Sequence, residues 1–201
     1  MKRFDCLKLL ASIVDSKTIV VANVGPISRE WNALRPSDAN LLQVNLGLCA
    51  AVGLGISVSL PHRKVVLLDG DGNLLLNLAS LADMANQNLG NTLHIVLDNE
   101  AYEGGGGLKS ATAGKADLSM IARGAGVPDT QVVTTLEEFE SKARQSTDNP
   151  GHHFMVAKVD KGSVGNLPTL TLDGKEAKYR FARYIESTEG VQILRPRYSH
   201  I

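Results

Sequence analysis

The sequence predicts an α/β fold, a three-layer sandwich in which helices cover both faces of a central, mostly parallel sheet. Short apolar runs that suit strands alternate with segments of helical periodicity along most of the chain. The strand candidates are continuous apolar runs, which is typical of parallel strands buried on both faces. The 201 residues are 43% hydrophobic, which is enough for one sizeable domain with its own core.

Composition excludes several classes of protein. The 21 basic and 21 acidic residues balance, so nothing indicates binding to nucleic acid or to an anionic membrane surface. No apolar run reaches the ~18 residues of a membrane span. Asp5 and Lys8 interrupt the N-terminal segment, which we expect to be an amphipathic helix and not a signal peptide. The two cysteines, Cys6 and Cys49, lie in apolar segments, which favours a reducing, cytoplasmic compartment.

Short runs rich in β-branched and other apolar residues predict the strands of the sheet. The predicted strands are residues 18–23, 64–69, 92–98, 130–134 and 153–159.

Helices are predicted between these strands in the first half of the chain. Apolar side chains recur at helical spacing from Phe4 to Val14. Residues 27–34 follow a Gly-Pro turn, and residues 46–60 are apolar nearly all round, which indicates a buried helix. A further helix is expected over residues 74–87. Its expected inward-facing residues are Leu74, Leu75, Leu78, Leu81, Ala82 and Ala85.

The second half continues the alternation and then changes character. Helices are expected over residues 117–126 and 136–145, and another over 175–187 after a loop rich in glycine. We therefore expect residues 1–160 to form one α/β domain. Residues 161–201 are expected to form a C-terminal arm that belongs to the same unit.

A carboxylate flanked by two glycines marks the candidate site. Asp71 stands between Gly70 and Gly72, where a predicted strand gives way to a helix that we expect to begin near Asn73. Ligands of open parallel sheets bind beyond the carboxyl ends of the strands, and a helix N-terminus favours a phosphate. The same residues also suit an ordinary turn with an aspartate cap. The motif alone leaves both interpretations open.

The end of the next strand favours a ligand site. Asp98 and Asn99 lie there, and they emerge at the same edge as Asp71 because a strand–helix–strand unit makes its two strands parallel. Two oxygen-bearing side chains and one backbone carbonyl are half of an octahedral Mg²⁺ shell, which leaves the other positions to water and phosphate. A domain that binds another phosphorylated ligand at this edge is an alternative.

Gly-Asp-Gly-Asn at 70–73, followed by Asn99 one strand later, resembles the motif of thiamin diphosphate-dependent enzymes. The stretches NVGPISREWNALRP, QVNLGLCAAVGLGISVSLP, KVVLLDGDGNLL and VLDNEAYEGGGG follow one another as they do in the sulfopyruvate and phosphonopyruvate decarboxylases. The tail DGKEAKYRFARYIESTEG is also similar to that group. The chain thus resembles the diphosphate-binding domain of a 2-oxo acid decarboxylase, in particular a sulfopyruvate decarboxylase beta subunit.

The resemblance implies thiamin diphosphate and Mg²⁺ as cofactors. It implies that Asp71, Asn99 and the backbone carbonyl of Ala101 bind the metal. The residues that it places along the diphosphate are Gly70, Gly72 and Asn73.

The same resemblance assigns the other end of the cofactor. Leu46, which precedes Gly47, is the bulky residue that would hold the cofactor in its bent shape. The carbonyl of Val44 would accept a hydrogen bond from the 4′-amino group of the cofactor. Gly25, Gly47 and Tyr102 complete the implied cofactor-binding set.

The glycine-rich loop departs from the pattern of these decarboxylases. Their Asp-Asn is typically followed by Ser or Thr, two glycines and Gln-Pro, whereas this loop contains Glu103, four glycines, Leu108 and Lys109. Gly105, Gly106 and Lys109 are candidate substrate-facing residues. Lys109 is either a partner for a sulfonate or phosphonate group or a solvated surface lysine.

No catalytic residue is assigned with certainty within this chain. The resemblance implies a glutamate beside the pyrimidine ring of the cofactor, supplied by a pyrimidine-binding domain. We expect a partner (alpha) subunit to carry it in a hetero-oligomer, with self-association also possible. The implied reaction converts a sulfopyruvate- or phosphonopyruvate-like 2-oxo acid to an aldehyde and CO₂. The alternatives are an acetolactate synthase-like carboligase and a non-catalytic thiamin diphosphate-binding subunit.

The histidines have no assigned role. His152 and His153 adjoin on a predicted strand and point to opposite faces, so we expect one packed and one exposed side chain and no metal pair. His62 and His94 are isolated, and Cys49 is expected to be a small apolar residue of a packed helix.

Overall fold

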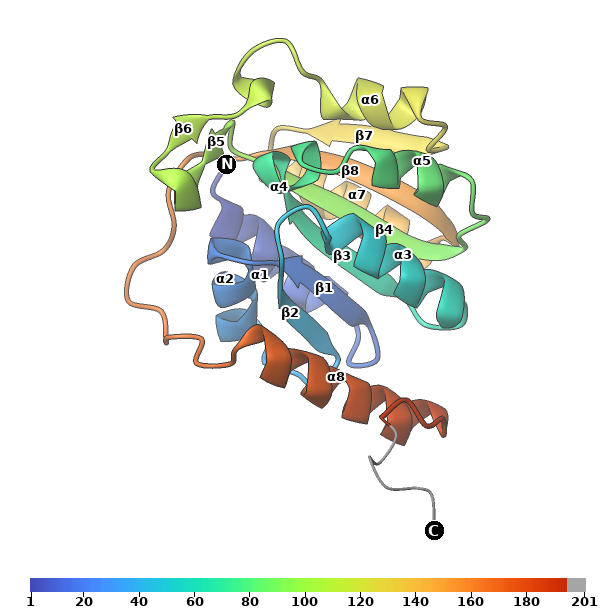
Figure 1. Ribbon diagram of the computed structural model, residues 1–201. Coiled ribbons are helices and arrows are strands. Elements are labelled where there is room, and N and C mark those ends of the chain that lie inside the picture. Colours follow the sequence, from blue (N-terminus) through green and yellow to red (C-terminus); the bar gives the residue numbers. More distant parts are fainter. Residues whose placement is uncertain (195–201) are drawn as a thin grey trace.

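Six parallel strands form the central sheet of the computed structural model, which describes residues 1–194 (Figure 1). The strand order is β2-β1-β3-β4-β8-β7, and every neighbouring pair is parallel. The α/β class and the parallel sheet are therefore confirmed. The strands of this sheet are β1 (Ile19–Asn23), β2 (Asn40–Val44), β3 (Val65–Gly70), β4 (Asn91–Asp98), β7 (Asp129–Val133) and β8 (Gly151–Lys158). A separate antiparallel hairpin consists of β5 (Ala101–Tyr102) and β6 (Leu108–Lys109).

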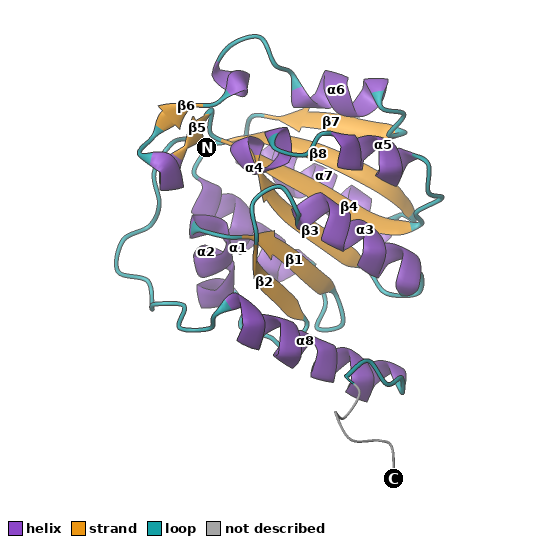
Figure 2. Cartoon of the chain, in the orientation of Figure 1, coloured by secondary structure: helices purple, strands orange, loops and turns teal. Residues whose placement is uncertain are grey.

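Helices cover both faces of the sheet, so that the orange strands lie between purple helices (Figure 2). One face packs against α1, α2 and α7, and the other against α3, α4, α5 and α6. The helices are α1 (Arg3–Ile13), α2 (Pro26–Leu34), α3 (Cys49–Ser59), α4 (Asp71–Leu75), α5 (Ala79–Ala85), α6 (Leu118–Gly124), α7 (Leu136–Asp148) and α8 (Gly174–Glu189). Two 3₁₀ turns, Glu103–Gly105 and Ala111–Ala113, flank β6.

The two cores follow from the alternation of side chains along each buried strand. In β3, Val66 and Leu68 point into the core beneath α1, α2 and α7, whereas Val65 and Leu67 point into the opposite core. All four are fully buried. A strand that must be apolar on both faces reads as a continuous apolar run, which is why β3 is visible in the sequence.

The strand β2 is missing from the sequence prediction. Its residues alternate between buried and half-buried positions, because it is the edge strand and α8 lies along it (Figure 1). A short half-covered strand lacks the apolar continuity of a central one. The covering helix also protects the exposed edge of the sheet from pairing with another chain.

The predicted helix at 46–60 is shortened at its N-terminus, and the predicted helix at 74–87 is divided in two and begins earlier. The first begins at Cys49 because Gly47 has a φ of +76°, which interrupts the helix in a conformation that favours glycine. The second divides into α4 and α5, and α4 already begins at Asp71, not near Asn73. The expected inward position of Ala82 is wrong, since this residue is exposed.

The C-terminal arm contains the expected helix. Asp173 caps α8 by accepting hydrogen bonds from the backbone N–H groups of Lys175 and Glu176. Phe181 and Ile185 of α8 pack into the same core as α3. The division at residue 160 stays a prediction, and residues 195–201 of the predicted arm lie outside the described residues. Among the residues described, no helix combines the length and the apolar character needed to cross a membrane.

Candidate active site at the carboxyl edge of the sheet

A cavity of about 520 Å³ opens at the carboxyl ends of β1, β3 and β4. The segments that follow these strands line the cavity, together with Arg3 and the glycine-rich loop. Most of the sequence-predicted site residues line it. These are Gly25, Leu46, Gly70, Asp71, Gly72, Asn73, Asn99, Ala101, Tyr102 and Gly105.

Four predicted residues are not part of the cavity lining: Val44, Gly47, Gly106 and Lys109. The carbonyl of Val44 accepts a hydrogen bond from the backbone N–H of Val24 at 2.8 Å. A carbonyl oxygen has a second lone pair, so this bond leaves one acceptor position open. Lys109 is exposed, and its backbone pairs with Ala101 in the β5–β6 hairpin.

Asp71 is a buried carboxylate, with 1% of its surface exposed. Its Oδ2 accepts hydrogen bonds from the hydroxyls of Ser110 and of Thr112, the latter at 3.1 Å. Burial raises the pKa of Asp71, and the charge of Asp98 raises it further, against the opposing effect of the two hydroxyls. In the described part of the chain, no cationic side chain pairs with Asp71.

The neighbouring carboxylate, Asp98, has partners of its own. Lys158 Nζ lies 2.7 Å from one oxygen of Asp98, and Thr112 Oγ1 lies 2.8 Å from the other. Lys158 therefore compensates Asp98 and leaves Asp71 without a counter-charge.

Oxygen atoms suited to a hard cation line the same cavity as this uncompensated carboxylate. Asn99 and Ala101 line the same cavity, and the side-chain oxygen of Asn99 accepts the backbone N–H of Ala101 at 3.1 Å. A carboxylate, an amide and a carbonyl are ligands that Mg²⁺ prefers, and a buried charge is stable when it is paired or coordinates a metal. The residues present fit Mg²⁺. Within residues 1–194, no cluster of three His, Cys, Asp or Glu side chains offers an alternative metal centre.

Two glycines of the cavity lining, Gly72 in α4 and Gly25 before α2, have distinct structural reasons. A Cβ atom on Gly72 would lie 2.5 Å from the ring of Tyr102, so the tyrosine packs against α4 only because position 72 is glycine. Gly25 has a φ of +107°, and a Cβ atom there would meet nothing within 4 Å. Gly25 therefore turns the chain beside the cavity and leaves its space open.

Leu46 and Asn73 also line this cavity. Leu46 is 60% exposed, although it is a large apolar residue. Asn73 uses both ends of its side chain within the protein, since its oxygen accepts the N–H of Gly47 and its nitrogen donates to Asp69. Both ends of the side chain are therefore held by the protein, and the second N–H of the amide stays available for the diphosphate that the resemblance implies.

A buried ion-pair network that the sequence analysis missed forms another wall. Arg3 donates two hydrogen bonds to Glu30, at 2.8 and 2.9 Å, and one to Glu103 at 2.8 Å. Burial lowers the pKa of Arg3, but the hydrogen bonds that Arg3 donates to both glutamates, together with their charges, outweigh burial and raise the pKa overall. The backbone N–H of Gly162 also donates to Glu103. The network thus connects α1, α2, the glycine-rich loop and the C-terminal arm.

Ser110 and Thr112 were also missed. They follow the glycine-rich loop in the sequence, and only the return of this loop to the sheet brings their hydroxyls to Asp71. The available signal was the pair of hydroxyl residues in Ser-Ala-Thr, directly after a loop already suspected of lining the site.

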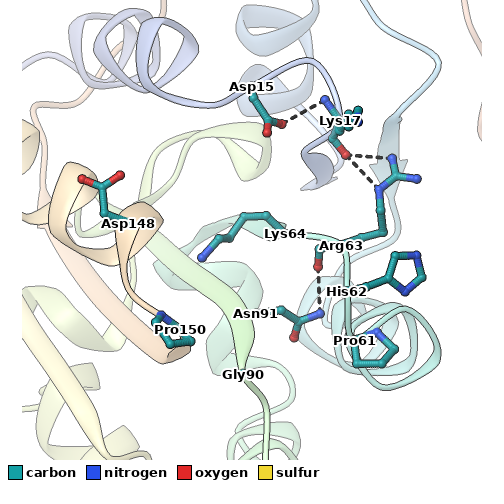
Figure 3. Close-up of a pocket in the computed structure, with 10 residues that line it drawn as sticks. All are labelled: Asp15, Lys17, Pro61, His62, Arg63, Lys64, Gly90, Asn91, Asp148 and Pro150. Carbon is teal, nitrogen blue, oxygen red and sulfur yellow. Dashed lines mark hydrogen bonds between the residues drawn. The ribbon is translucent and has the colours of Figure 1, made fainter.

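A second cavity, of about 400 Å³, lies at the amino ends of the strands, away from Asp71 (Figure 3). Several polar groups of this cavity bind within the protein: Arg63 donates to the carbonyl of Lys17 at 2.7 and 3.2 Å, and Asn91 donates to the carbonyl of Arg63 at 2.8 Å. Lys64 Nζ lies 3.4 and 3.5 Å from carbonyls that end α7. These contacts hold the segments that precede the strands and the end of α7 together, so the polar residues of this cavity have a structural role.

The two adjoining histidines correct one expectation. Both side chains are buried, whereas we expected one of them to be exposed. His153 Nδ1 lies 2.6 Å from a carboxylate oxygen of Asp129, whereas neither ring nitrogen of His152 has a partner among residues 1–194. Burial lowers the pKa of His152 to about 4. Cys49 is fully buried, as expected.

Comparison with known proteins gives a consistent result. Residues 31–157 match the family described as thiamine pyrophosphate enzyme, C-terminal TPP binding domain. The chain is 32% identical over 190 residues to sulfopyruvate decarboxylase subunit beta of Methanocaldococcus jannaschii, covering 92% of this chain and 97% of that one. It is 29% identical to phosphonopyruvate decarboxylase of Streptomyces viridochromogenes, covering 91% of this chain and 46% of that one.

A more distant relative and a solved structure extend the comparison. The large subunit of acetolactate synthase isozyme 1 from Escherichia coli is 26% identical over 181 residues, which cover 80% of this chain and 31% of that one. The crystal structure of benzoylformate decarboxylase from Polynucleobacter necessarius superposes with a TM-score of 0.65 at 18% identity. This similarity covers 82% of this chain and 34% of that chain, and it concerns the fold alone.

Proposed function

This chain belongs to the thiamine pyrophosphate enzymes, as their C-terminal TPP binding domain, and on this basis we propose its reaction. It is the beta-type subunit of a decarboxylase that converts sulfopyruvate, or a phosphonopyruvate-like 2-oxo acid, to an aldehyde and CO₂. The relatives of that activity match over more than nine-tenths of this chain.

The buried, uncompensated carboxylate of Asp71 carries the proposal. A carboxylate that is 1% exposed and lacks a described cationic partner destabilises the protein unless a cation binds it. Asp71, Asn99 and the carbonyl of Ala101 would hold Mg²⁺. The backbone from Gly70 to Asn73, at the start of α4, would then face the diphosphate.

The bound cofactor supplies the electron sink that accepts the electron pair released with CO₂. The residues of this chain bind and orient the cofactor, and they exclude water from the cavity. Val24, Ile27, Leu46 and Leu108 give the cavity an apolar wall, and an environment poor in water favours loss of the charged carboxylate of the substrate. Gly105, Gly106 and Lys109 are kept as candidates for the substrate-facing loop.

A partner subunit completes the site in this proposal. The relatives of similar length carry the name subunit beta, and the chain spans about half the length of the phosphonopyruvate decarboxylases that it matches. The remainder of the longer relatives corresponds to what an alpha subunit would supply, namely a pyrimidine-binding domain with its glutamate. The two free, buried cysteines support a reducing, cytoplasmic location.

One alternative has an observation of its own. The similarity to the acetolactate synthase large subunit favours a carboligase component that uses the same cofactor site. The two activities differ in what reacts after decarboxylation, so product analysis separates them. A subunit that binds the cofactor without catalysis would give neither product.

The first test is a calorimetric titration of thiamin diphosphate into the purified chain, with any subunit that co-purifies. Binding is expected with Mg²⁺, and it should disappear with EDTA or with Asp71→Ala. Asp83→Ala, which removes an exposed carboxylate on α5, should leave binding unchanged. Binding that is indifferent to both Mg²⁺ and Asp71 contradicts the proposed site. CO₂ release from sulfopyruvate by the assembled enzyme then tests the reaction.

A further inference from the structure

Two asparagine side chains, Asn73 and Asn77, bind the backbone of Gly47. The backbone N–H of Gly47 donates to Asn73 Oδ1 at 2.8 Å, and Asn77 Nδ2 donates to the Gly47 carbonyl at 3.0 Å. With a φ of +76°, and with its Cβ position 3.3 Å from Cβ of Leu76, position 47 also requires glycine. The N–H and the carbonyl of Gly47 are therefore both held by side chains of a different segment.

This arrangement is anchored in the buried core. Asn73 Nδ2 donates to Asp69, a fully buried carboxylate near the end of β3. The other oxygen of Asp69 lies 3.3 Å from Nε2 of His94, which is also fully buried. A polar chain thus runs from β4 through β3 and α4 to the turn at Gly47. Hydrogen bonds between buried groups restrict the motion of these side chains, and they hold every member of the chain at one atom or more, although Nδ1 of His94 has no partner among the described residues.

The residue that gains from a fixed turn is Leu46. It is 60% exposed, lines the cavity and directly precedes Gly47. Since packing against the core does not hold this side chain, its position depends on the backbone that carries it. The backbone next to it is the one that Asn73 and Asn77 bind.

We propose that Asn73 and Asn77 are positioning residues that fix Leu46 against the bound cofactor through the backbone of Gly47. Asn73 then acts on the cofactor through the Gly47 backbone, in addition to any contact that its second amide N–H makes. This inference rests on the proposed function, because it takes thiamin diphosphate as the ligand of the cavity.

A double-mutant cycle tests whether Asn77 acts through Leu46. The affinity for thiamin diphosphate with Mg²⁺ is measured by calorimetry for the wild type, Asn77→Ala, Leu46→Ala and the double variant, with any subunit that co-purifies. Asn77→Ala is expected to weaken binding about fivefold, the effect of one hydrogen bond. In the Leu46→Ala background the same change should have no effect. Additive losses would overturn the inference, as would full affinity in Asn77→Ala.

A second readout needs no cofactor. Asn73→Ala removes the acceptor of the Gly47 N–H, so NMR of the cofactor-free chain should find the Gly47 amide exchanging with solvent about tenfold faster. Asn86→Ala is the matched control, because Asn86 is exposed at the end of α5, and it should leave this rate unchanged. An unchanged rate in Asn73→Ala overturns the inference.

The outcomes separate this inference from the proposed function. If the wild type shows no binding of thiamin diphosphate that depends on Mg²⁺ and Asp71, both the inference and the proposed function are overturned. A wild type with such binding, together with an additive cycle, overturns the role of Asn77 alone and leaves the proposed function standing.

Discussion

The hydroxyl of Ser110 donates a hydrogen bond to the buried carboxylate of Asp71, although 39 residues separate the two along the chain. The bond joins the end of the glycine-rich loop to the start of α4. It therefore connects the candidate substrate loop to the proposed metal ligand. Hydrogen bonds of this kind orient a metal-binding carboxylate before the metal arrives.

Ser110→Ala is expected to weaken Mg²⁺-dependent binding of thiamin diphosphate by about tenfold, which is typical for the loss of a group that orients a metal ligand. Calorimetry measures this change. Ser119→Ala is the matched control, because its hydroxyl also donates to a carboxylate, that of Asp117, at 2.7 Å and away from the cavity. Equal effects of the two variants would contradict a special role for Ser110.

Asp71→Asn should stabilise the metal-free protein and abolish its Mg²⁺-dependent binding of thiamin diphosphate. The pKa of Asp71 is raised in the folded state, so the folded chain binds this proton more tightly than the unfolded chain does. The charged group consequently costs stability, and this cost grows as the pH rises from the ordinary pKa of an aspartate and is complete above the raised pKa. The amide removes this cost, and we expect a free energy of unfolding at pH 7 about 1 kcal/mol higher. Urea unfolding without metal measures it, and a less stable variant would contradict the expectation.

Arg3 and Glu103 should differ sharply in their importance for stability. Arg3→Gln leaves the fully buried Glu30 without its cation, which is expected to cost about 3–5 kcal/mol. Glu103→Gln leaves the Arg3–Glu30 pair intact and keeps a hydrogen-bond acceptor, so we expect a loss of about 1 kcal/mol. Urea unfolding compares the two variants. Similar losses would mean that the loop, and not Glu30, is the main partner of Arg3.

His152 should make the folded chain sensitive to mild acid. Burial lowers its pKa to about 4, whereas the unfolded chain keeps the ordinary value near 6.5. The unfolded state therefore binds more protons between these two values, and stability falls as the pH drops from about 6.5 to about 4. The expected loss is about 3 kcal/mol, at 1.4 kcal/mol per pKa unit.

His152→Leu tests this origin of the pH dependence. The variant should lose most of the slope between pH 6.5 and 4 in urea unfolding. His153→Leu serves as the comparison, because His153 has a carboxylate partner in Asp129. A slope that persists in His152→Leu would assign the acid sensitivity to other groups.

The sequence by itself determined the α/β class, the central strands and the edge at which Asp71 and Asn99 meet. Those features depend on local patterns: continuous apolar runs for strands buried on both faces, helical spacing between them, and the parallel arrangement that a strand–helix–strand unit imposes. The strand β2 was missed because an edge strand that one helix covers lacks the apolar continuity of β3 or β4.

Only the tertiary structure decided which side chains surround the site. Arg3 meets Glu103 at a separation of 100 residues, and Ser110 meets Asp71 at 39. Gly47 likewise binds two residues of another segment, Asn73 and Asn77. No local periodicity encodes such pairs. They arise when the packed sheet returns distant loops to its carboxyl edge, where burial makes each polar group require a partner.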